Sequence, residues 1–69
     1  MEELVAFGLK VKQLRESKNL SQEELAERCE LDRTYISRVE TAKRNPSLSN
    51  VFKIAAGLEV PPSSLFDNQ

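Results

Sequence analysis

The sequence lacks histidine and tryptophan, and its 69 residues include one cysteine and two glycines. One cysteine cannot form an intrachain disulfide, and without histidine it cannot complete a zinc site. Two glycines are too few for a glycine-rich phosphate-binding loop. A nucleophilic role for Cys29 would need a base, and the chain has no imidazole to act as one. We therefore expect neither an enzyme nor a protein that holds a metal or a cofactor.

Long apolar runs are also absent from the sequence. No segment approaches the ~20 apolar residues that a membrane-spanning helix needs. The N-terminal segment MEELVAFGLK begins with acidic side chains and so differs from the basic start of a signal peptide. A free thiol without an export signal fits a reducing compartment. We expect a cytoplasmic protein with no membrane contact and no small-molecule ligand.

The short length predicts one domain, residues 1–69, with a small hydrophobic core. A chain of this size buries only about 60% of the surface that it exposes when unfolded. Such domains often gain stability from disulfides, metals or association. The composition excludes the first two, so we expect the chain to associate as a homodimer.

The net charge of −1 is low for a nucleic-acid-binding protein, but the charges are unevenly distributed. Residues 32–53 hold five basic and two acidic side chains, whereas residues 1–31 hold five basic and seven acidic ones. Residues 54–69 hold two acidic side chains and no basic one. A local basic face can bind phosphates while the rest of the surface stays acidic. Residues 32–53 are therefore the candidate phosphate-binding segment.

The apolar pattern predicts an all-α fold of five helices, because no sustained alternation indicates a strand. The first helix is expected over residues 3–18. Apolar side chains recur there at 3–4–3 spacing on one face, namely Leu4, Phe7, Val11 and Leu14.

Polar residues mark the starts of the next two helices. Ser21 and Glu24 have the spacing of a capping box, before a helix that runs to about Arg28. After a short turn, Asp32 is a good N-cap for a helix over residues 33–40. Local capping therefore predicts two short helices in close succession.

A fourth helix is expected over residues 48–56, with Ser47 as its N-cap and Gly57 placed to end it. Two prolines then favour the first turn of a last short helix that ends near Phe66. The helix over 48–56 is more apolar than a surface helix, and one stripe comprises Leu48, Val51, Ala55 and Leu58. It is either central in the core or part of a dimer seam over residues 48–66, and both can hold. The expected dimer residues are Val51, Phe52, Leu58, Val60, Leu65 and Phe66.

Residues 21–40 therefore have the pattern of two short helices joined by a tight turn. Such a unit can place its second helix in the major groove of DNA. Small or apolar side chains are available to hold the two helices together: Leu25, Ala26, Leu31, Ile36 and Val39. The residues left facing outward on the second helix are Arg33, Thr34, Ser37 and Arg38. Arginine can bond two guanine atoms, and a threonine methyl can pack on a thymine methyl.

Five segments of the sequence together resemble a known family: FGLKVKQLR, LSQEELAE, LDRTYISRVE, KRNPSL and VFKIAAGLEV. The chain is similar to the lambda-repressor-like helix-turn-helix proteins, also called XRE-type regulators. The similarity extends from Phe7 to Phe66. Within the family, LDRTYIS followed by RNPSL is most similar to the small controller proteins of restriction–modification systems. The resemblance implies a compact five-helix domain that binds double-stranded DNA as a homodimer on a pseudo-palindromic operator.

The resemblance also implies roles for individual residues. Base contacts would come from Arg33, Thr34, Ser37 and Arg38. Contacts to the DNA backbone would come from Gln22, Tyr35, Lys43, Arg44, Asn45, Ser49 and Asn50. Of these, Ser49 and Asn50 could present backbone amides to a phosphate, as helix N-termini do. Arg15 and Glu40 match the positions of an internal ion pair and are therefore expected to be structural.

Two residues depart from the family pattern. Glu30 in the turn and Ala42 in the loop after the second helix stand where glycine is usual. A non-glycine residue in left-handed backbone costs roughly 1 kcal/mol.

Other interpretations exist for the same residues. The arginines could be solvated surface charges, and the ring of Tyr35 could pack on the edge of the core instead of contacting DNA. Cys29 occupies a small-residue turn position, which favours a structural role over redox sensing. The whole chain could be a protein-interaction module, such as an antitoxin with secondary DNA binding, or a dimeric scaffold. A scaffold leaves the basic segment unexplained, so we predict a sequence-specific DNA-binding transcriptional regulator.

Overall fold

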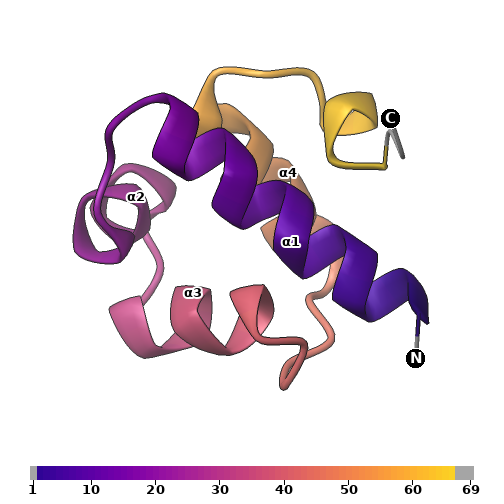
Figure 1. Cartoon of the computed structure of the whole chain (residues 1–69). Helices are drawn as coiled ribbons and strands as arrows, with labels where there is room; N and C mark the ends of the chain where they lie inside the picture. Colours follow the sequence, from indigo (N-terminus) through magenta and orange to yellow (C-terminus); the bar gives the residue numbers. More distant parts are fainter. Residues whose placement is uncertain (1, 67–69) are drawn as a thin grey trace.

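The structure, a computed structural model, describes residues 2–66 and is all-α over that range, as predicted. It contains four α-helices and one short 3-10 helix (Figure 1). Their bounds are α1 (Glu2–Ser17), α2 (Gln22–Cys29), α3 (Arg33–Glu40), α4 (Leu48–Leu58) and η1 (Pro62–Phe66). None of these helices is both long enough and apolar enough to span a membrane.

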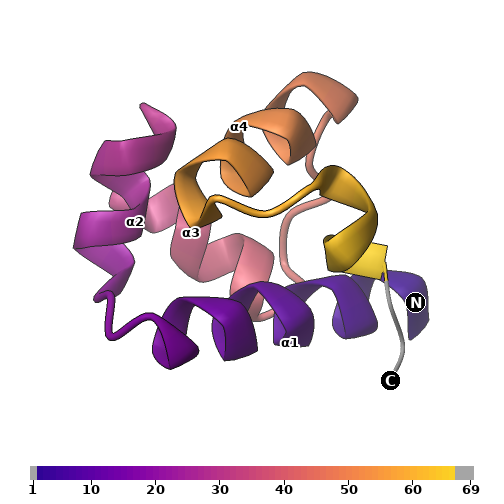
Figure 2. The ribbon, with the colours of Figure 1, turned by 90° about the horizontal axis from the view of Figure 1, so that it is seen from above.

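The helices surround one core. α2 packs against α3 and α4, while α1 packs against α3. The short helix η1 bridges α4 and the first half of α1, as the view from above shows (Figure 2). α3 and η1 consequently lie on opposite sides of the molecule (Figure 1). Within residues 2–66, this arrangement leaves the outer face of α3 uncovered by any other helix.

Every helix contributes at least one fully buried large side chain to the core: Val11, Leu25, Ile36, Val39, Ile54, Leu58 and Leu65. Burying one such side chain contributes about 1.5–3 kcal/mol. Because the contributions come from all five elements, the outer face of α3 is held in place by the whole molecule rather than by its neighbour α2 alone.

Each of the four α-helices is followed, one or two residues after its end, by a left-handed residue that is not glycine. The left-handed residues are Asn19, Glu30, Ala42 and Glu59, with φ between 58° and 62°. After α2, the N–H of Leu31 donates to the carbonyl of Ala26 at 2.9 Å, and the N–H of Glu30 donates to that of Glu27 at 3.2 Å. Paired bonds of this kind satisfy carbonyls that a helix end leaves without a partner.

The prediction that Gly57 ends the fourth helix is wrong. α4 continues through Gly57 to Leu58, and Glu59 is the left-handed residue that ends it. Gly57 instead allows α4 to approach α2, because a Cβ atom there would lie 2.5 Å from the sulfur of Cys29. The glycine is thus required for packing between helices rather than for a turn.

Candidate nucleic-acid interface

Side-chain caps set the start of each helix in the α2–α3 unit. The N–H of Glu24 donates to Ser21 Oγ at 3.0 Å, and the N–H of Ser21 donates to Glu24 Oε1 at 2.8 Å, so the predicted capping box is confirmed. The bond from the Ser21 backbone holds the pKa of the Glu24 carboxyl below its usual value. Asp32 caps α3, as predicted, by accepting from the N–H of Thr34 at 2.9 Å.

α3 has one buried face and one outward face. Ile36 and Val39 are fully buried beneath it. The four predicted base-contact residues point the other way, with Arg33, Thr34 and Arg38 exposed and Ser37 half-buried. Their spacing of three and four residues places them side by side on the helix surface. The structure thus brings together the residues that were predicted to face DNA bases.

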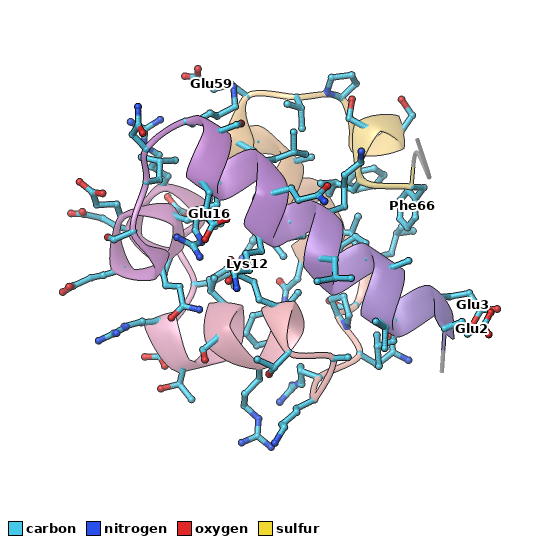
Figure 3. The ribbon with its side chains drawn as sticks, in the orientation of Figure 1. Glu2, Glu3, Lys12, Glu16, Glu59 and Phe66 are labelled. Carbon is cyan, nitrogen blue, oxygen red and sulfur yellow. The ribbon has the colours of Figure 1, made fainter. Side chains whose placement is uncertain are left out.

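The basic side chains near α3 have no acidic partner in the described part of the chain. Within residues 2–66, both ion pairs involve Arg15, which lies in α1. The charges of α3 and of the loop after it, on Arg33, Arg38, Lys43 and Arg44, are therefore available to phosphates. Two acidic groups at α3 have other partners, since Asp32 caps the helix and Glu40 pairs with Arg15. Other acidic groups lie farther away: Glu59 is at the edge opposite α3, and Glu2 and Glu3 are at the N-terminal end of α1 (Figure 3).

The predicted ion pair between Arg15 and Glu40 is present and buried. Arg15 Nε donates to Glu40 Oε2 at 2.7 Å, and Nη2 donates to Oε1 at 3.1 Å. The bond to Glu40 raises the pKa of Arg15 above its already high value. Arg15 also donates to the carbonyl of Leu20 at 2.7 Å, so one guanidinium joins α1, the following loop and the end of α3.

Gln22, predicted to bond a phosphate, is tied to this pair. Its amide nitrogen donates to Glu40 Oε1 at 3.1 Å, across the junction between α2 and α3. The sequence pattern did not reveal this bond. A primary amide has a second hydrogen, so the bond to Glu40 leaves Gln22 with one donor for an outside acceptor.

Two of the predicted backbone-contact residues, Arg44 and Asn50, contact a third, Tyr35. The side-chain amide of Asn50 donates to the hydroxyl of Tyr35 at 3.0 Å. The guanidinium carbon of Arg44 lies 5.1 Å from the centroid of the Tyr35 ring, a distance typical of a cation–π contact. Tyr35 itself is half-buried and packs against the core, which was one of its two expected roles, and its contact with DNA stays a prediction.

The prediction for the start of α4 needs one correction. The backbone N–H of Asn50 already donates to Ser47 Oγ at 3.2 Å, which is the N-cap bond of the helix. That amide is therefore not available to a phosphate, contrary to the prediction. The first amides of the helix, at Leu48 and Ser49, precede its hydrogen-bonded turns and lack an intrahelical acceptor.

The predicted dimer surface is partly wrong. Val51, Leu58 and Leu65 lie in the core, with 6%, 0% and 1% of their surface exposed, so they have almost no surface left for a second copy. They face inward because α4 packs on α2 and η1 covers α4. Val60 is half-buried and packs against the same core.

An exposed apolar surface nevertheless remains within residues 48–66. Leu48 is 69%, Phe52 53% and Phe66 59% exposed. Beside them, a groove of about 340 Å³ is lined mainly by Leu4, Phe7, Pro46, Leu48, Val51 and Phe66. The rings of Phe7 and Phe66 lie 5.4 Å apart, which fixes Phe66 at the edge of this groove. Leu48 belongs to the predicted apolar stripe, but as the first residue of α4 it lies beyond the reach of the core and is exposed.

Known proteins share both this fold and this sequence pattern. A family model described as helix-turn-helix matches residues 11–65. The control protein C.BamHI of Bacillus amyloliquefaciens is 55% identical over 62 residues, which cover 88% of this chain and 76% of that protein. The control protein C.MunI of a Mycoplasma species is 51% identical over 65 residues, covering 93% of this chain and 88% of that protein.

A solved structure shows a similarity to the same class of control proteins. The restriction-modification controller protein C.AhdI from Aeromonas hydrophila matches with a TM-score of 0.94 at 45% identity, over 96% of this chain and 100% of that chain. These relatives are control proteins rather than enzymes. The chain therefore belongs to the XRE-type helix-turn-helix family of DNA-binding transcription regulators.

Proposed function

We propose that the protein binds a pseudo-palindromic operator as a homodimer and reads its sequence with the outer face of α3. The observation that carries this proposal is the grouping of Arg33, Thr34, Ser37 and Arg38 on a helix face that no other element of the described chain covers. The two arginines have no acidic partner within residues 2–66. Arginines that have no acidic partner can form paired hydrogen bonds to guanine, and the neighbouring hydroxyls can contact either bases or phosphates.

Dimer formation is supported by the apolar surface around Leu48, Phe52 and Phe66. The groove beside these residues includes Asn45 and Pro46, so the surface continues directly into the loop after α3. A twofold axis that passes through this surface and points toward the outer face of α3 would place the two copies of that loop, and with them both α3 helices, on the same side of the dimer. Helices that read adjacent turns of DNA lie about 34 Å apart.

The biological role that we infer is that of a restriction–modification controller. Relatives that are 45–55% identical have names or titles that describe them as control proteins or restriction-modification controllers. We propose that occupancy of the operator excludes or recruits RNA polymerase at nearby genes, including the gene for the protein itself.

Selection of binding sites from random duplex DNA tests these proposals together. We expect enrichment of two inverted half-sites whose centres are separated by about one DNA turn, roughly 10 base pairs. The double variant Arg33→Ala/Arg38→Ala, which keeps the core intact, is the matched control and should enrich no defined sequence. Failure of the unmodified protein to enrich any motif, together with recovery of a stoichiometric protein partner from cells, would favour the interaction-module hypothesis.

A further inference from the structure

The contacts among Tyr35, Arg44 and Asn50 link three different parts of the chain. Tyr35 lies in α3, Arg44 in the following loop and Asn50 in the first turn of α4. The phenolic oxygen of Tyr35 accepts from Asn50, and its ring faces the guanidinium of Arg44. One side chain on the DNA-reading helix therefore contacts two residues that were predicted to bind the DNA backbone.

The backbone of the loop directs Arg44 toward this ring. Ala42 is left-handed with φ 62°, and the N–H of Lys43 donates to the carbonyl of Arg38 at 2.8 Å. The chain thus reverses immediately after α3. Arg44 is exposed, and an exposed arginine that touches nothing loses side-chain entropy when a ligand immobilises it. The ring of Tyr35 restricts Arg44 before any ligand is bound.

We propose that Tyr35 is a positioning residue that holds Arg44 and Asn50 as one unit, which we call the tyrosine clamp, against the DNA backbone beside the groove that α3 enters. This inference rests on the proposed DNA-binding function. The ring preorders Arg44 for a phosphate, and the hydroxyl fixes the amide of Asn50. The hydroxyl still has its own hydrogen, which can be donated to a phosphate oxygen.

A purely structural role for Tyr35 makes different predictions. If the ring only fills space at the edge of the core, replacing it changes stability but not the contribution of Arg44 to DNA binding. If the tyrosine clamp exists, the contribution of Arg44 depends on the ring, and the contribution of Asn50 depends on the hydroxyl. These dependences are measured as coupling in double-mutant cycles.

The first cycle combines Tyr35→Leu with Arg44→Ala and uses the duplex obtained by site selection, over a range of salt concentrations. Arg44→Ala should weaken binding and flatten the salt dependence in the unmodified protein, because a phosphate contact is lost. In the Tyr35→Leu background the same change should cost at least about threefold less, in keeping with a cation–π contact of moderate strength. Lys43→Ala is the matched control, since Lys43 neighbours Arg44 but forms no cation–π contact with the ring among the described residues, and its effect should be independent of Tyr35.

The second cycle separates the hydroxyl from the ring. Tyr35→Phe keeps the aromatic face and removes the acceptor for Asn50. We expect Tyr35→Phe and Asn50→Ala to be coupled, whereas the effect of Arg44→Ala should be unchanged in Tyr35→Phe. Because Tyr35→Phe is a small change, this variant keeps the test valid even if Tyr35→Leu fails to fold.

A measurement on the protein without DNA distinguishes failure of the clamp from failure of the proposed function. In the NMR spectrum, protons of the Arg44 side chain next to its guanidinium should be shifted upfield by the ring, and the shift should persist in Tyr35→Phe. Random-coil shifts for these protons would overturn the inference whether or not the protein binds DNA. Normal operator binding with additive cycles would overturn it too, while leaving the proposed function intact.

Discussion

Arg33 and Arg44 carry the same charge but stand in different surroundings. Arg33 is the first residue of α3 and extends from a capped helix end, whereas Arg44 lies in the loop beside the ring of Tyr35. Contacts to bases distinguish sequences, and contacts to phosphates do not. The two residues should therefore affect binding in different ways.

Arg33→Ala should weaken binding to the selected operator by ~1–3 kcal/mol and relax specificity at one base pair of each half-site, because paired bonds to guanine are lost. Titrations with the operator and with single-base variants provide the measurement. Arg44→Ala is the comparison, and it should weaken binding to all of these duplexes similarly. Uniform weakening by Arg33→Ala would assign Arg33 to phosphate contact instead.

Glu30 carries a conformational cost that the sequence pattern already indicated. Its φ of 58° is left-handed, which costs a residue with a Cβ atom about 1–2 kcal/mol. Glycine removes this cost but adds about 0.4–1 kcal/mol of unfolded-state entropy. We expect Glu30→Gly to raise the free energy of unfolding by roughly 0.5–1 kcal/mol in urea titrations. Glu30→Ala, which keeps the Cβ atom, should give no such gain, and an equal gain from both variants would point to the exposed charge as the cause.

Cys29 should make stability depend on pH above neutrality. Burial raises the pKa of its thiol from the ordinary 9.0 to about 11. The unfolded chain therefore loses this proton at a lower pH than the folded chain does. The stability that the group contributes is complete below about pH 9 and is lost as the pH rises toward 11. Between these values the free energy of unfolding should fall more steeply for the unmodified protein than for Cys29→Ala, and parallel curves would contradict this explanation.

At the scale of elements, the contact between α1 and α3 depends on Gly8. A Cβ atom there would lie 2.8 Å from the carbonyl oxygen of Glu40 and closer still to that of Val39. These oxygens belong to the backbone of the last turn of α3, so they cannot move aside as the end of a flexible side chain can. The same turn holds Glu40, the partner of Arg15.

Gly8→Ala should therefore destabilise the fold, although alanine favours a helix interior by about 1 kcal/mol over glycine. Crowding of a well-packed contact costs about 1–3 kcal/mol, and the backbone clash belongs at the upper end of that range. Thermal unfolding followed by circular dichroism would measure the loss. Lys12→Ala, on the exposed side of α1 (Figure 3), should change stability by less than about 0.5 kcal/mol. A more stable Gly8→Ala variant would show that α1 and α3 can move apart without loss of stability.

The starts of the helices were predictable from sequence, and their ends were less so. Ser21, Asp32 and Ser47 all act as N-caps, because an N-cap needs a suitable side chain two or three residues before the amide that it accepts from. The end of α4 was misplaced, because the rule that glycine follows a helix failed for Gly57 and Glu59. Here the demand for close packing decided where glycine was needed.

At the scale of the whole molecule, the apolar surface and the basic surface adjoin each other. Leu48 and Phe52 are exposed on α4, next to the loop that carries Lys43 and Arg44. Association through the apolar surface would therefore place the basic loops of two copies near one another. Two copies joined in this way contact more phosphates than one, which strengthens binding and increases its salt dependence.

Leu48→Glu should weaken the proposed dimer by at least about tenfold, because a charge would replace an apolar side chain that the dimer buries. Sedimentation velocity over a range of concentrations would measure the change. Leu9→Glu is the matched control: Leu9 is also exposed, at 52%, but lies on α1 outside the groove. Dissociation by Leu9→Glu and not by Leu48→Glu would move the dimer surface to α1.

The sequence by itself determined the helical class, the α2–α3 unit and the residues of its outward face. These features depend on helix caps and on spacings of three or four residues, so they arise from residues that are close together in the sequence. The ion pair between Arg15 and Glu40 was also predictable, although from resemblance rather than from spacing.

Only the tertiary structure decided which apolar residues of 48–66 are buried and which remain exposed. The segment is apolar on more than one side, so its burial depends on how α2 and η1 cover α4 rather than on its own pattern. The same reason applies to the tyrosine clamp, in which residues up to 15 positions apart meet through a side-chain bond between α3 and the start of α4. Side chains separated in sequence can be assigned to one site only when the fold has set the distance between them.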